Sequence, residues 1–388
     1  MYDWLVIGGG IHGCTVASFL LKKGKVRVER LCIIDPHDKP MYKWKKNTER
    51  IGMEYLRSPS VHHIDVDPFS LQKYAVHSNQ EQTNFYGRYK RPSLELFNKH
   101  CESIVKEANL HQCWHQGWVN SIEKEQGFWK VRTKNGYEVR AQNIVLSISI
   151  NNQLNIPDWS KKLRAVSSNQ VFHIFEENPV PLSSLQPPIA VIGGGITAAH
   201  VTIKLSSMYP GKVVLIKRHS FRIEDFDSDP GWLGPKNLRS FHKIKSYEER
   251  RWLIQEARNK GSLTKELFYK LKKLDSEKKI TIIDGEVKSA FAKNDGITLK
   301  MEDKKIDVHN ILLATGFIPS PPGFNWLGKL MKDLDLPCAK CGYPIISKAL
   351  EWCPHLYVSG PLAELEVGPI ARNISGARHA AERIVNSL

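Results

Sequence analysis

One pattern occurs twice in this 388-residue chain, and it limits the possible folds more than any other feature. Each copy has a short apolar run, a glycine-rich turn, an apolar stretch of helical length and a second apolar run. The successive segments are residues 4–7, 8–13, up to 21 and 30–35 in the first copy, and residues 189–192, 193–198, up to about 207 and 213–216 in the second. This order is typical of a β–α–β unit, so we expect two such units.

Each copy continues with short alternating segments that end in a further apolar run. These segments are residues 117–122, 128–132, 137–140 and 143–148 in the first copy, and residues 286–291, 296–301, 305–308 and 310–316 in the second. A repeated pattern of this length predicts two related Rossmann-like units. A proline-rich stretch at residues 179–188 favours an extended connection and marks the expected boundary.

The first glycine turn has the spacing of a dinucleotide-binding site. A helix N-terminus offers unpaired N–H groups and the positive end of a dipole to a pyrophosphate. Gly8 supplies the tight turn, Gly10 leaves room for the pyrophosphate, and Gly13 lets the helix pack closely on the strand. Asp35 ends the next strand, about 20 residues beyond Gly13, where a carboxylate accepts hydrogen bonds from ribose hydroxyls.

The second glycine turn repeats this spacing with Gly193, Gly195 and Ala198. It differs at the end of the following strand, where Lys217 and Arg218 replace the carboxylate. Cationic side chains bind the 2′-phosphate of NADPH through charge-assisted hydrogen bonds, whereas a carboxylate would repel it. The sequence therefore favours NADPH for the second unit. The alternative is that these side chains are merely two of the 56 basic residues.

Composition bears on the location of the protein. The apolar fraction of 41% and the charged fraction of 25% are those of a globular protein, and no run approaches the ~18 apolar residues that span a bilayer. The first apolar run leads into a glycine turn rather than a cleavage site, so we expect a cytoplasmic protein. Seven scattered cysteines do not resemble a secreted disulfide framework, and we expect reduced thiols.

The formal charge of +16 raises the question of nucleic-acid binding. Basic residues are spread along the chain with acidic residues among them, as on an ordinary solvated surface. We expect no nucleic-acid partner.

The two glycine turns, with the motif Ala314-Thr315-Gly316 that closes the second unit, resemble the two-domain flavoprotein superfamily. The closer resemblance is to flavin-dependent N-hydroxylating monooxygenases, the lysine and ornithine hydroxylases, and to uncharacterised FAD/NAD(P)-binding relatives. It implies an α/β fold with two Rossmann-like dinucleotide-binding domains, the NADPH domain being inserted in the FAD domain. The FAD domain would comprise residues 1–180 and 321–388, and the NADPH domain residues 187–320. Thr315 and Gly316 would then bind cofactor.

The resemblance also implies site residues near the C-terminus. In such proteins a glycine-containing strand and the helix after it approach the flavin, which assigns Gly360, Gly368 and Pro369 to cofactor binding. N–H groups at the start of that helix would face the flavin carbonyls. For Arg372 and Asn373, flavin contact and a place on a surface helix are equal alternatives.

Two further segments are candidates for the active site. Residues 57–63 follow the second strand, where related enzymes bring side chains toward the flavin. His62 or His63 is the catalytic candidate, and two structural histidines are the alternative. Residues 221–235 form an acidic and aromatic loop, which is either a cover for the nicotinamide or substrate pocket or a surface loop held by Trp232.

The activity that the resemblance implies is a monooxygenation. NADPH would reduce FAD, reduced flavin would react with dioxygen at C4a, and the hydroperoxide would oxygenate a nucleophilic nitrogen or sulfur. The partners would be oxygen and a small amine, amino acid, thiol or thioether. The protein would contribute positioning and a pocket that excludes water. The sequence leaves the substrate and the oligomeric state open.

Two other functions stay open. Cys338 and Cys341 form a Cys-x-x-Cys pair, a candidate for a flavin-dependent disulfide or electron-transfer reductase, although the pair follows the Ala-Thr-Gly strand. Together with Cys353 and His355 it has ligand types that suit zinc, but the spacing is irregular. Unreactive cysteines and no metal are therefore favoured. The other possibility is a non-catalytic sensor that retains FAD.

Overall fold

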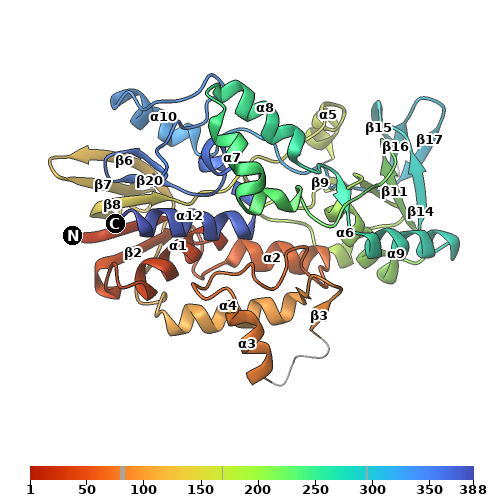
Figure 1. The fold of residues 1–388 in the computed structure, drawn as a ribbon. Coiled ribbons are helices and arrows are strands. Elements are labelled where there is room, and N and C mark those ends of the chain that lie inside the picture. Colours follow the sequence, from red (N-terminus) through yellow and green to blue (C-terminus); the bar gives the residue numbers. More distant parts are fainter. Residues whose placement is uncertain (79–83, 168, 294–295) are drawn as a thin grey trace.

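The computed structural model describes residues 1–78, 84–167, 169–293 and 296–388. It contains two mainly parallel sheets at opposite ends of the molecule, and both chain termini lie beside the first (Figure 1). The first sheet has the order β19 (Glu351–Cys353), β20 (Leu356–Val358), β8 (Glu138–Leu146), β1 (Tyr2–Ile7), β2 (Leu31–Asp35), β5 (Trp114–Gln116). The second has the order β14 (Thr281–Asp284), β11 (Val213–Lys217), β10 (Ile189–Ile192), β18 (Asn310–Leu313), β9 (Val171–His173).

The remaining strands either extend the first sheet or form small separate sheets. They are β6 (Val119–Glu125) and β7 (Phe128–Thr133), which extend the first sheet from β8; the three-stranded sheet of β15 (Ser289–Lys293), β16 (Gly296–Lys300) and β17 (Lys305–Val308); and the pairs β3 (Phe85–Tyr86) with β4 (Arg91–Pro92) and β12 (Arg222–Ile223) with β13 (Ser262–Leu263).

The central strands explain why the two copies of the sequence pattern fold alike. Leu5 in β1 is fully buried and pairs in parallel with Cys32 of β2 on one side and Ile144 of β8 on the other. Val191 in β10 has the equivalent place between β11 and β18. Continuous apolar runs are expected where helices cover both faces of a parallel sheet. The expected pair of β–α–β units is therefore confirmed.

The chain returns to the first sheet after completing the second. Strand β20 pairs in parallel with β8, with Tyr357 opposite Val145. Helix α12 (Ile374–Asn386) then packs beside α1 (Ile11–Lys22), and Figure 1 shows these first and last long helices side by side. The second unit is thus inserted in the first, which confirms the expected fold class.

The strands differ from the sequence expectations in two places. Strand β9 pairs with β18, so the second sheet gains an edge strand from before the proline-rich link at residues 179–188. The limits 1–180, 187–320 and 321–388 stay a prediction. The two segments expected at 137–140 and 143–148 form the single strand β8, since its first part pairs with β7 and its last part with β1.

Helices cover the sheets and fill the space between them. Besides α1 and α12 they are α2 (Tyr42–Ile51), α3 (Ser70–His77), α4 (Leu94–Glu107), α5 (Asp158–Val166), α6 (Ile196–Met208), α7 (Pro235–Lys243), α8 (Tyr247–Ala257), α9 (Lys265–Ser276), α10 (Phe324–Asp333) and the short α11 (Glu364–Val367). No helix in the described ranges is long and apolar enough to cross a membrane.

A buried ionic cluster joins the inserted unit to the C-terminal segment. The carboxylate of Glu364 is fully buried and forms ion pairs with Arg251, with Arg258 at 3.2 Å and with Arg372 at 2.7 Å. Arg372 also donates a hydrogen bond to the hydroxyl of Tyr343. Breaking such a pair leaves an uncompensated buried charge, which costs about 3–5 kcal/mol. The cluster therefore fixes α8 against the segment that follows β20.

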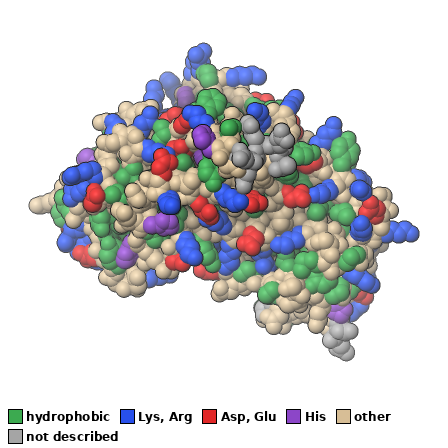
Figure 2. Space-filling model, turned by 90° about the horizontal axis from the view of Figure 1, so that it is seen from below, with side chains coloured by type: hydrophobic (Ala, Val, Ile, Leu, Met, Phe, Trp, Pro, Cys, Tyr) green, Lys and Arg blue, Asp and Glu red, His purple; other side chains and the backbone are tan. Residues whose placement is uncertain are grey.

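The surface charge is mixed. Figure 2 shows Lys and Arg side chains interspersed with Asp and Glu over the face that it presents. Many of these pair with one another, as in the ion pairs Lys45–Glu102 and Lys99–Glu95. This face agrees with the expected solvated surface.

Buried histidines make the stability of the fold dependent on pH. Burial lowers the pKa of His100, His173 and His200 to about 4, and that of His63 to about 3, from an ordinary 6.5. Between these values the unfolded chain binds more protons than the folded one, so stability must fall as the pH drops from 6.5 toward 4.

We expect the denaturant midpoint to fall steeply between pH 6.5 and pH 4.5, with proton uptake on unfolding near pH 5. The variant His173→Gln should show a shallower pH dependence, because it removes one of the titrating groups. A midpoint that stays constant over this range would contradict the burial of these side chains.

Candidate functional site

The first glycine turn has the close contacts that the sequence predicts. A Cβ at Gly8, where φ is +100°, would lie 2.6 Å from the carbonyl oxygen of Ser147. A Cβ at Gly13 would lie 1.7 Å from the carbonyl oxygen of Gly8. Gly10 caps α1, and no atom lies within 4 Å of the place that its Cβ would take. The approach to the helix N-terminus is thus open at Gly10.

Asp35 holds this turn from the end of β2. Its Oδ2 accepts a hydrogen bond from Gly9 N at 2.7 Å, and its Oδ1 accepts one from His37 N at 2.9 Å. A carboxylate offers about four acceptor positions, so both oxygens retain capacity for a hydroxyl group. The observed role of Asp35 is to hold the turn by these hydrogen bonds. Its contact with a ribose stays a prediction.

The second glycine turn repeats the geometry with one difference. A Cβ at Gly193, where φ is +149°, would lie 2.5 Å from the carbonyl oxygen of Ala314. Gly195 caps α6, and Ala198 is buried in its first turns. The place of a Cβ at Gly195 lies 3.2 Å from the Cα of Gly261. A loop that includes Gly261 therefore borders the second turn, whereas the first is open.

The two basic residues after β11 have different environments. Lys217 is buried, and its ammonium group pairs with Asp284 at the end of β14. Arg218 is exposed at the edge of the turn. The expected phosphate contact therefore fits Arg218 better than Lys217, whose charge already has a partner.

The Ala-Thr-Gly motif, which follows β18, is hydrogen-bonded to Asn155. Thr315 donates a hydrogen bond to the carbonyl of Asn155 at 2.5 Å, and the carbonyl of Gly316 accepts one from Asn155 N at 3.0 Å. Gly316 has φ +79°, a left-handed conformation that favours glycine. These hydrogen bonds and the positive φ give Thr315 and Gly316 a structural role. Their contact with cofactor stays a prediction.

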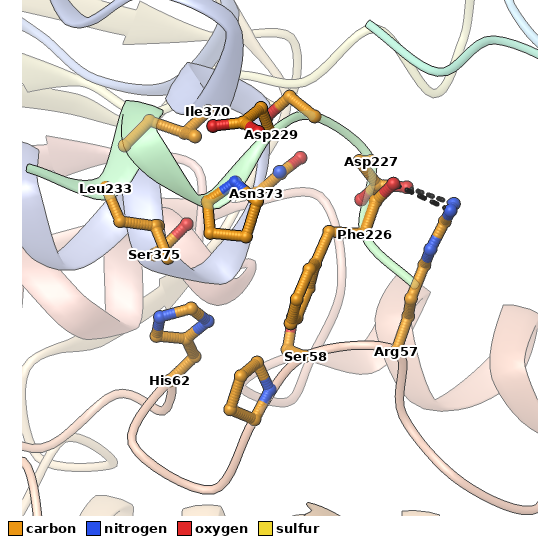
Figure 3. A pocket seen from close by; sticks show the side chains of 13 residues that line it. Arg57, Ser58, His62, Phe226, Asp227, Asp229, Leu233, Ile370, Asn373 and Ser375 are labelled. Carbon is orange, nitrogen blue, oxygen red and sulfur yellow. Dashed lines mark hydrogen bonds and ion pairs between the residues drawn. The ribbon is translucent and has the colours of Figure 1, made fainter. Parts of the chain in front are cut away.

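A pocket lies where three distant segments meet. Figure 3 shows Arg57, Ser58 and His62 from the loop after α2, Phe226, Asp227, Asp229 and Leu233 from the inserted unit, and Ile370, Asn373 and Ser375 from the C-terminal segment. In the loop 221–235, residues 226–230 line this pocket and Trp232 packs edge-on against Phe241 at 5.6 Å. A role of the loop in covering the nicotinamide or the substrate stays a prediction.

Only one of the two adjacent histidines reaches this pocket. His62 lines it, and burial together with the charge of Arg378 lowers the pKa of His62 to about 4. His63 is fully buried elsewhere; its Nδ1 accepts a hydrogen bond from Asp65 N at 3.2 Å, and its Nε2 donates to the carbonyl of Pro68 at 3.1 Å. The two ring nitrogens of His63 thus hold its own loop, and a catalytic role for His62 or His63 stays a prediction.

The C-terminal segment reaches the pocket at a later residue than expected. Residues Pro369–Arg372 form a single 3-10 turn, and α12 begins after an extended Asn373. Gly368 and Pro369 face the inserted unit, since the carbonyl of Pro369 accepts a hydrogen bond from Arg258 at 3.2 Å. Their contact with cofactor stays a prediction. The helix N-terminus at the pocket is therefore that of α12.

Gly360 and Arg372 have defined contacts within the protein, and contact of either residue with the flavin stays a prediction. Gly360 has φ +71°, and its Cβ place lies 3.5 Å from the ring of His12 in the first turn of α1, so it faces the first glycine turn. Arg372 lies neither on a surface helix nor in the pocket, because its guanidinium is bound to Glu364 and Tyr343. Asn373 lines the pocket.

Arg57 is a residue whose role the sequence did not indicate. Its guanidinium donates to the carbonyls of Glu224 and Phe226, both at 2.7 Å, and pairs with Asp227 at 2.7 Å. It also reaches Ser262 at 3.0 Å. One side chain from the first unit thus holds two loops of the inserted unit at the pocket.

Cys338 and Cys341 are partly buried free thiols, and a redox role for this pair stays a prediction. Cys338 and Cys341 lie on a turn closed by a hydrogen bond from Ala339 N to the carbonyl of Tyr343, and burial raises the pKa of Cys338. All seven cysteines are free thiols. In the ranges that the structure describes, no three His, Cys, Asp or Glu side chains are grouped so as to hold a metal.

The donor groups at both turns suit pyrophosphates. Helices α1 and α6 each begin without a capping side chain and without an acidic residue in the first turn. Their first N–H groups are therefore free to bind an anion. The residues present fit two dinucleotides, one at Gly8–Gly13 and one at Gly193–Ala198.

The comparison with known families agrees with this geometry. The model of the L-lysine 6-monooxygenase/L-ornithine 5-monooxygenase family matches residues 66–319, more than half of the chain. No curated protein sequence matches the chain.

Solved structures of the same fold span the whole chain. An ornithine hydroxylase from Pseudomonas aeruginosa is 19% identical with a TM-score of 0.75, covering 100% of this chain and 98% of its own. An L-lysine 6-monooxygenase from Pseudomonas syringae is 18% identical with a TM-score of 0.75, covering 100% and 99%. A cadaverine monooxygenase from Erwinia amylovora, solved with FAD, is 15% identical with a TM-score of 0.77, covering 100% and 94%. The resemblance stated from the sequence is confirmed.

The variant Gly10→Ala tests the first turn without disturbing the fold. The added methyl group meets no protein atom, and the backbone at Gly10 is extended, so the stability of the cofactor-free protein should not change. The same methyl group would occupy the approach of the pyrophosphate. We expect FAD to bind at least tenfold more weakly, as measured by fluorescence titration.

Gly328→Ala in α10 is the matched control, because its Cβ is also unobstructed. It should retain FAD like the unmodified protein. Full FAD affinity in Gly10→Ala would exclude this turn as the FAD site.

Proposed function

Since this chain belongs to the L-lysine 6-monooxygenase/L-ornithine 5-monooxygenase family, we propose that it hydroxylates a nitrogen atom of a small amine at the junction of its two units. As a member it is a flavoprotein oxidoreductase that uses FAD and NADPH. The balanced reaction takes R–NH2, O2, NADPH and H⁺ to R–NHOH, NADP⁺ and H2O. Bound FAD would supply the hydride acceptance and oxygen activation that no side chain provides.

The observation that carries this proposal is the composition of the pocket. Its walls come from the unit with the open first turn, from the inserted unit and from the segment with the N-terminus of α12. Nucleotides bound at the two turns would extend toward such a junction. Ligands in open α/β sheets bind at the carboxyl ends of the strands, which supports the assignment.

The side chains at the pocket suit a reaction on an unprotonated amine. The low pKa of His62 keeps its imidazole neutral at physiological pH. A neutral imidazole accepts a hydrogen bond from an amine N–H group without the negative charge by which a free carboxylate would stabilise the ammonium form. Of the two carboxylates that line the pocket, Asp227 is paired with Arg57 and Asp229 accepts a hydrogen bond from Gly231 N. Arg57 holds the covering loop by bonds to its carbonyls and so limits entry of water.

Arg218 is proposed to select NADPH over NADH. A charge-assisted hydrogen bond contributes about 1.5–3 kcal/mol, which is about 10- to 100-fold in affinity. We expect Arg218→Gln to raise the KM for NADPH by this factor and to leave the KM for NADH unchanged. Lys217→Gln should change the NADPH preference less, because Lys217 is paired with Asp284. Steady-state kinetics with both nucleotides measure this, and equal effects on NADPH and NADH would argue against a phosphate contact.

The function itself is tested by a screen of amines, amino acids and thiols with the FAD-loaded protein and NADPH. Hydroxylated product is measured by mass spectrometry and hydrogen peroxide is measured separately. We expect at least one amine to give hydroxylamine with little peroxide. NADPH oxidation that yields peroxide alone with every amine would refute the proposal.

A further inference from the structure

A second cavity lies beside the candidate pocket, and Arg57 lines both. We call it the tyrosine cavity; it has a volume of about 350 Å³ and is lined by Tyr55, Tyr86 and Arg91 of the first unit and by His200, Glu266 and Tyr269 of the inserted unit. Sites for small molecules commonly have about 300–1,000 Å³ and lie at domain interfaces. The size and position of the cavity therefore suit a small ligand at the junction of the two units.

The positive charges around the tyrosine cavity already have partners. Arg91, whose side chain is 8% exposed, pairs with Glu266, and Lys270 pairs with Glu54 at 2.7 Å. The guanidinium of Arg57 is turned to the loop that includes Asp227. Lys273 also lines the cavity and pairs with Glu277 at 3.8 Å. A ligand carboxylate would have to compete with Glu54, Glu266 or Glu277 for a cationic partner. The ion pairs therefore disfavour ligands that carry a carboxylate.

The aromatic side chains present a different kind of surface. Tyr86 and Tyr269 are 41% and 58% exposed, and the rings of Tyr55 and Tyr86 lie 5.3 Å apart at 45°. The guanidinium of Arg91 already lies over the Tyr86 ring, with 5.0 Å between them. Aromatic faces attract organic cations and also pack against apolar groups. These rings suit an amine with an apolar or aromatic body.

His200 adds one polar group without a partner. Its side chain is 6% exposed, and its Nε2 has no hydrogen-bond partner in the part of the chain that the structure describes. Buried polar atoms normally find a partner, and each exception needs an explanation such as a ligand. An N–H group of an amine next to His200 would provide one.

We propose that the tyrosine cavity binds an organic amine that has an aromatic or apolar body and no free carboxylate. The inference rests on the proposed function and specifies its substrate class, since the cavity adjoins the candidate pocket across Arg57. The apolar or aromatic part of the amine would pack against the tyrosine rings. This packing, and not an ion pair with an α-carboxylate, would determine which ligands bind. Free lysine and ornithine would then be poor ligands of this chain.

Matched pairs of probes test this class directly. The FAD-loaded protein without NADPH is titrated calorimetrically with 2-phenylethylamine and with phenylalanine, which differ only in the carboxylate. We expect 2-phenylethylamine to bind at least tenfold more tightly. Cadaverine and lysine form a second pair that should differ in the same direction.

Three variants connect the binding to the cavity. Tyr269→Ala should weaken 2-phenylethylamine about fivefold or more, whereas Trp252→Ala should not, because Trp252 is an equally exposed aromatic on α8 that does not line the cavity. Glu266→Gln frees Arg91 and should tighten phenylalanine relative to 2-phenylethylamine.

The outcomes separate the site from the reaction. Equal binding of the two members of a pair, or unchanged binding in Tyr269→Ala, would overturn the proposed ligand class. Binding in the expected order, with no hydroxylated product from any amine, would support the cavity and count against the proposed function alone.

Discussion

The close approach of two glycine turns to a neighbouring strand is the constraint on which the rest of the structure depends. A side chain at Gly8 or Gly193 would lie within 2.6 Å of a carbonyl oxygen on the adjacent strand, Ser147 in one unit and Ala314 in the other. The chain can therefore pass directly from the end of a buried strand into a helix whose first N–H groups point outward. That arrangement creates an anion site at each turn, and the return of β20 to the first sheet brings the C-terminal segment to the junction of both units.

The sequence predicted those parts of the fold that depend on local pattern. The strands and helices of both β–α–β units lie within one or two residues of their expected bounds, because apolar periodicity and glycine spacing are local signals. Strand β9 was not expected, since three residues carry too little pattern. The start of α12 was placed too early, because Pro369 is compatible with a helix start and the break at Asn373 is set by packing.

The site could be predicted only in part. The glycine turns follow from spacing, but sequence does not distinguish His62 from His63, which point to different surroundings one residue apart. Arg57 and Lys217 have partners far away along the chain, as Glu364 does in Arg251, so no local signal indicates that Lys217 is paired or that Arg57 holds two loops. The ion pairs of the tyrosine cavity likewise exist only after the two units have come together.

The central claim is that the two turns hold two different nucleotides, close enough for electrons to pass between them. The most direct measurement is the anaerobic mixing of FAD-loaded protein with one equivalent of NADPH while the absorbance of oxidised flavin is followed. We expect complete bleaching by one equivalent of NADPH, and slower bleaching by NADH. An oxidised flavin spectrum that persists in excess NADPH would contradict it.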